Sequence, residues 1–127
     1  MTSAATEPGD GSFNVAVLRG ALTTDVRVCD LPGGGVVHNF DVKAGAGDDR
    51  HVVPVAWHDP VRPPKLRRGD RVVVVGAVRR RWFRVGGGSR SRTELVARSV
   101  ARTGSLRVAR MLEDAAATMD PSLLSQG

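Results

Sequence analysis

The alternation of apolar and polar residues along the chain predicts a succession of short β-strands. The expected strands cover residues 13–19, 23–29, 36–43, 51–58, 71–85 and 92–100. Turn residues separate them, namely Pro and Gly in 31–35, Gly and Asp in 44–49, and Gly and Ser in 86–89. The two runs that flank residues 86–89 predict a long β-hairpin, and Pro54 places its strand at an edge or a bulge.

Two segments fall outside this strand pattern. Residues 59–70 form a proline-rich connector in which a short helix is expected near Pro64. Residues 105–119 carry an apolar stripe at helical spacing and are followed by Pro121, which should end the helix. The stripe is expected to dock on the sheet or on a second subunit, and it consists of Leu106, Ala109, Leu112, Ala116 and Met119. Short strands with at most one helix between them are typical of a small all-β barrel.

The length of 127 residues indicates one domain with short extensions. We expect a flexible arm over 1–12, the barrel domain over 13–103, and a helix and tail over 104–127. No apolar run approaches the roughly 20 residues that span a bilayer, and the start has no secretory apolar region, so a cytoplasmic protein is expected. The single cysteine, Cys29, excludes an internal disulfide and a thiolate zinc cage.

Charge changes this picture because it is unevenly spread. Residues 61–110 hold 15 basic and 2 acidic side chains, a net charge of +13, within a chain whose overall charge is +6. A segment of this charge repels itself unless a polyanion binds it. A preference for Arg over Lys explains the residue type, but it does not explain the clustering.

The candidate chemistry does not point to catalysis. The chain has no H-E-x-x-H motif, nucleophile elbow or paired carboxylates, and its triple glycines at 33–35 and 86–88 lack the Lys-Ser/Thr of a phosphate loop. The histidines, His38, His51 and His58, have no metal-ligand spacing. We therefore expect no enzyme activity, no metal and no cofactor.

Basic residues with interleaved aromatic residues form the remaining pattern. In the segment 78–85, strand alternation puts Arg79, Arg81 and Phe83 on one face. Arg80, Trp82 and Arg84 fall on the other face. A core would not accept this much charge, so the hairpin is expected to project. Rings beside guanidinium groups suit single-stranded nucleic acid, because bases stack on rings and arginines hold phosphates.

The other aromatic residues are more ambiguous. Phe13 is expected in the core or in a subunit contact. Phe40 and Trp57 can be read as core residues, but the polar neighbours of Trp57 favour stacking on a base, as do the basic neighbours of Phe83.

Five segments in order carry a family resemblance. They are Asn14–Leu22, similar to the family pattern N-x-V-x-L-x-G-N-L, Asp25–Phe40, similar to D-P-E-V…P-x-G-x-x-V-x-N-F, Leu66–Val72, similar to L-x-K-G-x-x-V, Gly76–Arg81, similar to G-x-L-x-x-R, and Arg92–Ala97, similar to Y-x-T-E-V-V-A. Over residues 13–103 the sequence resembles the bacterial single-stranded-DNA-binding proteins of the OB-fold family. The resemblance implies a five-stranded OB-fold barrel that binds and protects single-stranded DNA in replication, recombination or repair, associated with the nucleoid.

The resemblance also implies site residues. The family's stacking positions fall on Trp57, on Phe83 with Trp82 adjacent, and on His51, while the loop 44–49 has no aromatic counterpart. The full expected DNA-binding set is Phe40, His51, Trp57, Arg68, Arg71, Arg79, Arg81, Trp82, Phe83, Arg84 and Arg92. A homotetramer or dimer is expected through the first strand, by Asn14, Val15, Ala16, Val17 and Leu18.

Two alternatives stay open. One is a dimer similar to primosomal replication protein B, which bridges replication proteins, and the other is a protein-interaction barrel whose basic segment faces an acidic partner. The family's acidic C-terminal tip has no counterpart in residues 122–127, so partner recruitment by a tail is not expected. No residue distinguishes DNA from RNA.

Overall fold

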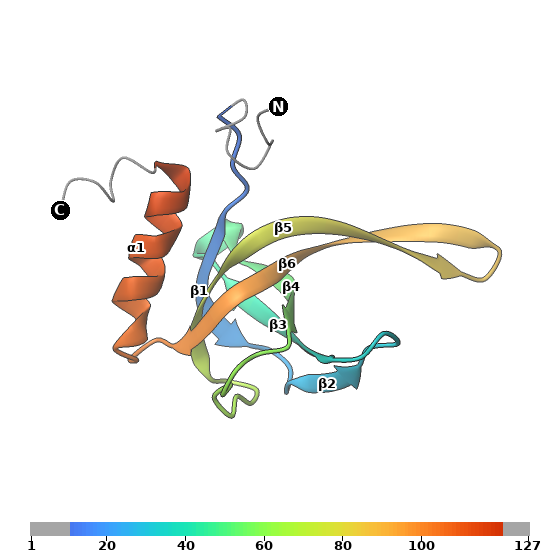
Figure 1. The fold of residues 1–127 in the computed structure, drawn as a ribbon, viewed down its shortest axis with the longest axis horizontal. Helices are drawn as coiled ribbons and strands as arrows, with labels where there is room; N and C mark the ends of the chain where they lie inside the picture. The colour runs from blue at the N-terminus through green and yellow to red at the C-terminus, as the bar shows by residue number, and fades with distance from the viewer. Residues whose placement is uncertain (1–10, 121–127) are drawn as a thin grey trace, which may run out of the picture.

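The computed structural model describes residues 11–120 and is mostly β, with one helix at the C-terminal end (Figure 1). The elements in chain order are β1 (Ala16–Leu22), β2 (Arg27–Asp30), β3 (Val36–Ala44), a 3₁₀ turn η2 (Gly47–Asp49), β4 (His51–His58), β5 (Arg71–Val85), β6 (Gly88–Arg102) and α1 (Arg107–Met119). The predicted arm, apart from residues 11 and 12, and the predicted end of the tail from Pro121 onward lie outside the described residues.

The strands form one sheet whose pairing closes into a ring. The order is β1-β5-β6-β4-β3, and β3 pairs back with β1. β2 pairs only with β3 at its outer edge, and β4 with β6 is the one parallel pair. This closed pairing gives the barrel-like all-β class that the strand pattern predicted, because a sheet that closes on itself leaves few open edges.

Two glycines let the strands cross closely enough to close the ring. A Cβ on Gly20 would lie 2.1 Å from the carbonyl oxygen of Lys43 in β3, and one on Gly76 would lie 2.0 Å from that of Val96. Gly76 also marks a register shift between β5 and β6. The prediction that the first strand ends before Gly20 is therefore wrong, since this glycine lies inside β1 at the contact with β3.

The interior of the ring is a single apolar cluster. Its members are Leu22, Phe40, Val42, Val55, Trp57, Val72, Val74, Leu95, Ala97 and Val100. They come from β1, β3, β4, β5 and β6. In β5 the four residues 72–75 are all buried, because Val72 and Val74 face the ring whereas Val73 and Val75 face α1. Pro54 lies in β4 just before its parallel pairing with β6 begins at Val55, as its predicted edge position requires.

Helix α1 packs on the outside of β5 and β6 and forms a second, smaller core (Figure 1). Met111 and Ala115 contact Val73, Val75 and Ala101. The prediction that this stripe docks on the sheet is wrong, because Leu106 and Leu112 are 98% and 42% exposed and Met119 is 46% exposed; docking on a second subunit stays a prediction. The helix has two adjacent apolar faces, and the periodicity of the sequence does not say which of them meets the sheet.

The long hairpin extends beyond the ring. β5 and β6 pair along their whole length up to Val85 opposite Gly88, so the tip has two residues instead of the predicted four. Gly86 adopts a φ of 59°, which tight hairpin turns require and glycine supplies without strain. No helix forms near Pro64 in the described chain, and residues 59–70 run as an irregular connector. The outer half of the hairpin stands free of the body (Figure 1).

Candidate nucleic-acid interface

The outer half of the β5–β6 hairpin has two faces set by strand register. Arg79 lies opposite Glu94, Arg81 opposite Arg92, and Phe83 opposite Arg90. Trp82 lies opposite Ser91 on the other face, between Arg80 and Arg84. Both faces therefore carry arginines and one aromatic ring, as alternation predicted.

The two rings on this hairpin are open to solvent. Trp82 is 64% exposed and Phe83 is 37% exposed. The guanidinium carbon of Arg80 lies 5.8 Å from the Trp82 ring centre, and that of Arg81 lies 5.8 Å from the Phe83 ring centre. A cation this close to an aromatic face is attracted to it, so each ring is presented together with a positive charge.

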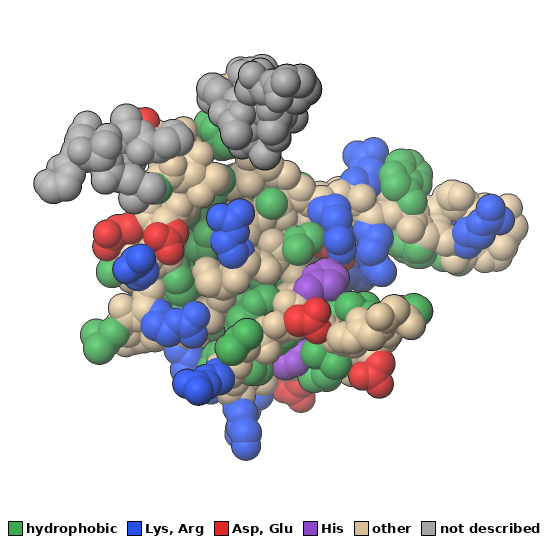
Figure 2. All heavy atoms as spheres, viewed as in Figure 1, with side chains coloured by type: hydrophobic (Ala, Val, Ile, Leu, Met, Phe, Trp, Pro, Cys, Tyr) green, Lys and Arg blue, Asp and Glu red, His purple; other side chains and the backbone are tan. Residues whose placement is uncertain are grey.

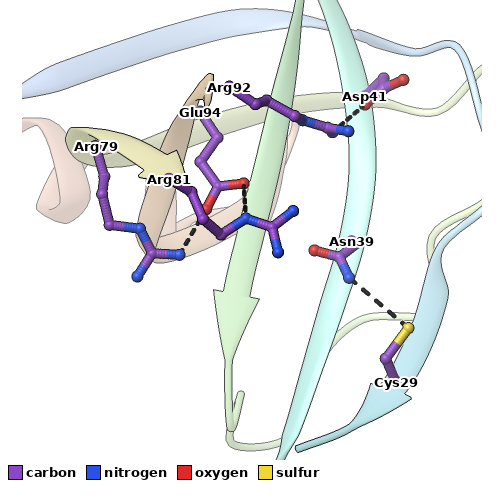
Figure 3. Close-up of polar contacts among 7 residues, drawn as sticks. All are labelled: Cys29, Asn39, Asp41, Arg79, Arg81, Arg92 and Glu94. Atoms are coloured by element: carbon purple, nitrogen blue, oxygen red, sulfur yellow. Dashed lines mark hydrogen bonds and ion pairs between the residues drawn. The ribbon is translucent and has the colours of Figure 1, made fainter. Parts of the chain in front are cut away.

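A buried carboxylate organises two of the arginines. Glu94 is only 4% exposed, and its Oε2 accepts a hydrogen bond of 2.5 Å from Nη2 of Arg79. Its Oε1 lies 3.6 Å from Nε of Arg81 (Figure 3). Removing a charge from water is costly unless it is paired, and two guanidinium groups pair this one. Each arginine keeps further N–H donors that Glu94 does not engage.

A second carboxylate is attached more loosely to a third arginine. Asp41 of β3 places Oδ1 3.8 Å from Nη2 of Arg92, which is an ion pair without a hydrogen bond (Figure 3). Both Asp41 Oδ1 and Arg92 Nε are buried atoms that have no hydrogen-bond partner among the described residues. The same face continues to Asn39, whose amide donates to Sγ of Cys29 at 3.8 Å.

Positively charged side chains gather where the β5–β6 hairpin leaves the body of the molecule (Figure 2). Figure 2 shows blue side chains at the base of the β5–β6 hairpin, above a second projection formed by the β2–β3 hairpin. We call the hairpin face of Arg79, Arg81 and Arg92, together with the exposed rings of Trp82 and Phe83, the arginine patch.

Two of the expected stacking residues lie in the interior of the ring. Phe40 is 1% exposed and Trp57 is 6% exposed, and both belong to the interior cluster. They border a hollow beside Pro64 and Leu66, but almost none of their ring surface is accessible to a base. Strand alternation places both side chains inside the ring, and the polar neighbours of Trp57 point outward.

Three further expected residues lie away from the arginine patch. Arg68 is in the connector and Arg71 begins β5, about 25 Å along the strand from Arg79. His51 begins β4 and borders a hollow beside Val17 and Leu18 of β1. Arg84 does belong to the hairpin, on the face of Trp82.

Sequence reasoning missed the two carboxylates. Glu94 and Asp41 read as ordinary strand residues, although Glu94 is one of only two acidic residues among 61–110. An isolated carboxylate within a strongly basic hairpin is the signal that could have identified Glu94, because such a group needs partners.

The described residues 11–120 contain no group of three or more side chains that could hold a metal ion, and no helix among them is long and apolar enough to cross a membrane. Comparison with known proteins adds no assignment: no protein-family model matches the chain, and no curated protein is significantly similar to it.

Proposed function

We propose that this protein is an OB-fold barrel that binds single-stranded DNA without reading its sequence and protects it during replication, recombination or repair. One observation carries the proposal: Trp82 and Phe83 are exposed on opposite faces of a projecting hairpin, each within 5.8 Å of an arginine. Rings left open to water in this way lose the benefit of burial, and a base that stacks on them restores it.

The ring of five strands supports the fold part of this proposal. β1, β5, β6, β4 and β3 close on one another, which is the strand number of an OB-fold barrel. OB-folds bind oligonucleotides on the outer face of two neighbouring strands, between two loops. Here β3 and β4 are those strands, and the β2–β3 and β5–β6 hairpins flank them.

The chemistry of the arginine patch supports a single strand over a duplex. Base stacking on an aromatic ring contributes about 1–3 kcal/mol per base and tolerates any sequence, whereas a duplex offers no free base faces. Arginines Arg79, Arg81 and Arg92 supply N–H donors for phosphates. No base-reading arrangement is needed for this mode of binding.

We also propose that the protein assembles through β1, as a dimer or a tetramer. Residues 16–19 pair with β5 along one edge, but their other edge has no partner strand in the described chain, because β3 pairs only with residues 20–22. Val17 is 44% exposed and borders an apolar hollow with Val108 and Leu112 of α1. An open strand edge beside an apolar hollow favours strand addition by a second copy. Light scattering after gel filtration should give a multiple of 13.5 kDa, and a strict monomer at micromolar concentration would contradict this part.

Binding can be tested with three labelled ligands of equal length: oligo-dT, an abasic oligonucleotide that keeps the phosphates, and a duplex. Fluorescence anisotropy should rank oligo-dT tightest, because only it offers free bases to the rings. Equal affinity for the abasic strand would reduce the mechanism to charge alone. Absence of oligo-dT binding at low salt would reject the function.

A further inference from the structure

We infer that Asp41 is a built-in competitor of phosphate, which occupies Arg92 in the free protein and is displaced when a nucleic acid strand binds. The inference rests on the proposed function and adds a regulatory element to the same surface. It is based on a difference between two ion pairs: Glu94 holds Arg79 by a short hydrogen bond, whereas Asp41 lies near Arg92 without one (Figure 3).

Glu94 and Asp41 differ in burial, in distance to the arginine and in hydrogen bonding, and each of these affects how firmly a carboxylate holds an arginine. Glu94 is 4% exposed and hydrogen-bonded to Arg79 at 2.5 Å. Asp41 is 27% exposed, lies 3.8 Å from Arg92, and makes no side-chain hydrogen bond to it. Breaking the Glu94 pair would leave a charge buried, whereas breaking the Asp41 pair lets a partly exposed carboxylate return to water.

The atoms of the loose pair are also left unsatisfied. Oδ1 of Asp41 and Nε of Arg92 are buried and without a hydrogen-bond partner among residues 11–120. The Arg92 side chain is 41% exposed, and a phosphate that accepts a hydrogen bond from its Nη groups makes a stronger contact than an ion pair without a hydrogen bond. Exchange of Asp41 for phosphate therefore gains hydrogen bonds that the free protein lacks.

The geometry assigns different roles to the two carboxylates. Glu94 positions Arg79 and Arg81 and stays in place when the strand binds. Asp41 lowers affinity, because its charge neutralises Arg92 before binding and repels the phosphate that replaces it. Each arginine that binds a phosphate releases a cation from the nucleic acid, but the freed Asp41 takes up a cation. The net number of cations released on binding is therefore smaller than the number of arginine–phosphate contacts.

The test compares Asp41→Asn with Asp114→Asn. Asp114 pairs with Arg110 at 3.3 Å on the exposed side of α1, so the control makes the same charge change and frees an arginine outside the arginine patch. Oligo-dT affinity should rise about two- to fivefold in Asp41→Asn, and the slope of log K on log salt should steepen by up to about 0.7. Asp114→Asn should change both by much less.

A second comparison isolates the pair. In an Arg92→Gln background, Asp41→Asn should no longer tighten binding, because the residue it competes for is gone. Circular dichroism checks that each variant is folded, and Asp41→Ser replaces Asp41→Asn should the latter unfold.

Three results would overturn the inference: an unchanged affinity in Asp41→Asn, an equal gain in Asp114→Asn, or an equal gain from Asp41→Asn in the absence of Arg92. If the parent protein itself fails to bind oligo-dT, the proposed function falls and the competitor role with it.

Discussion

The ring of strands and the projecting hairpin each contain one phenylalanine and one tryptophan, but these residues lie in different environments. Phe40 and Trp57 lie in strands that have partners on both edges and a closed sheet around them, and they are 1% and 6% exposed. Trp82 and Phe83 lie in the outer part of the hairpin, where β5 and β6 pair with each other and with no other strand, and they remain exposed.

The difference teaches that burial here is decided by sheet closure rather than by sequence neighbours. Trp57 is followed by His58 and Asp59, yet its side chain points into the ring. Phe83 is flanked by Trp82 and Arg84 and points out, because no second layer covers the hairpin beyond the ring. The ring residues thus support stability, and the hairpin residues are available for binding.

The largest expected effect is on stability, from Phe40→Ala. Removing a fully buried phenyl ring leaves a cavity and should lower the free energy of unfolding by about 3–5 kcal/mol in urea denaturation. Phe83→Ala is the matched control on the hairpin and should change it by no more than about 0.5 kcal/mol. Equal effects of the two substitutions would erase the distinction between ring and hairpin.

The next effect is on binding, from Trp82→Ala. Loss of one stacking ring should weaken oligo-dT binding by about 1–3 kcal/mol at any salt concentration, measured by anisotropy. Trp82→Phe keeps a ring and should retain most of the affinity. Unchanged affinity in Trp82→Ala would mean that the exposed indole does not meet a base.

A smaller effect on stability is expected from Glu94→Gln. The substitution keeps the shape but leaves Arg79 and Arg81 without their shared negative charge, so unfolding should become easier by about 1–2 kcal/mol. Asp114→Asn on α1 breaks a fully surface pair and should cost less than about 0.5 kcal/mol. A neutral outcome for Glu94→Gln would show that Glu94 does not hold the two arginines.

The smallest effect concerns salt dependence, from Arg84→Ala. If Arg84 contacts one phosphate, the slope of log K on log salt should fall by about 0.7, with a modest loss of affinity at low salt. Arg110→Ala on α1 removes the same charge away from the hairpin and serves as the control. Identical slopes for the two variants would remove Arg84 from the interface.

Much of the fold could be predicted from local pattern, since strand alternation and turn residues are local properties. Alternation located all six strands within a few residues and placed arginines on both faces of the hairpin. What failed depended on contacts between distant segments. Gly20 was read as a strand end, but it marks the close crossing of β1 and β3, which only the closed ring creates.

The carboxylates of the site show the same limit. With a four-residue tip at 86–89, Glu94 would face Arg81, whereas the two-residue tip places it opposite Arg79. Asp41 reaches Arg92 because β4 brings β3 and β6 together, and no spacing in the sequence encodes that contact. A pattern can therefore locate the basic hairpin, but it cannot identify which acidic residues restrain it.

The most direct test of the account uses the two tryptophans as separate reporters. Trp57→Phe leaves Trp82 as the only indole, and Trp82→Phe leaves Trp57. Titration with oligo-dT should quench the fluorescence of the Trp57→Phe variant strongly and that of the Trp82→Phe variant weakly, because only Trp82 is open to a base. Strong quenching of Trp57 with an unresponsive Trp82 would contradict the account.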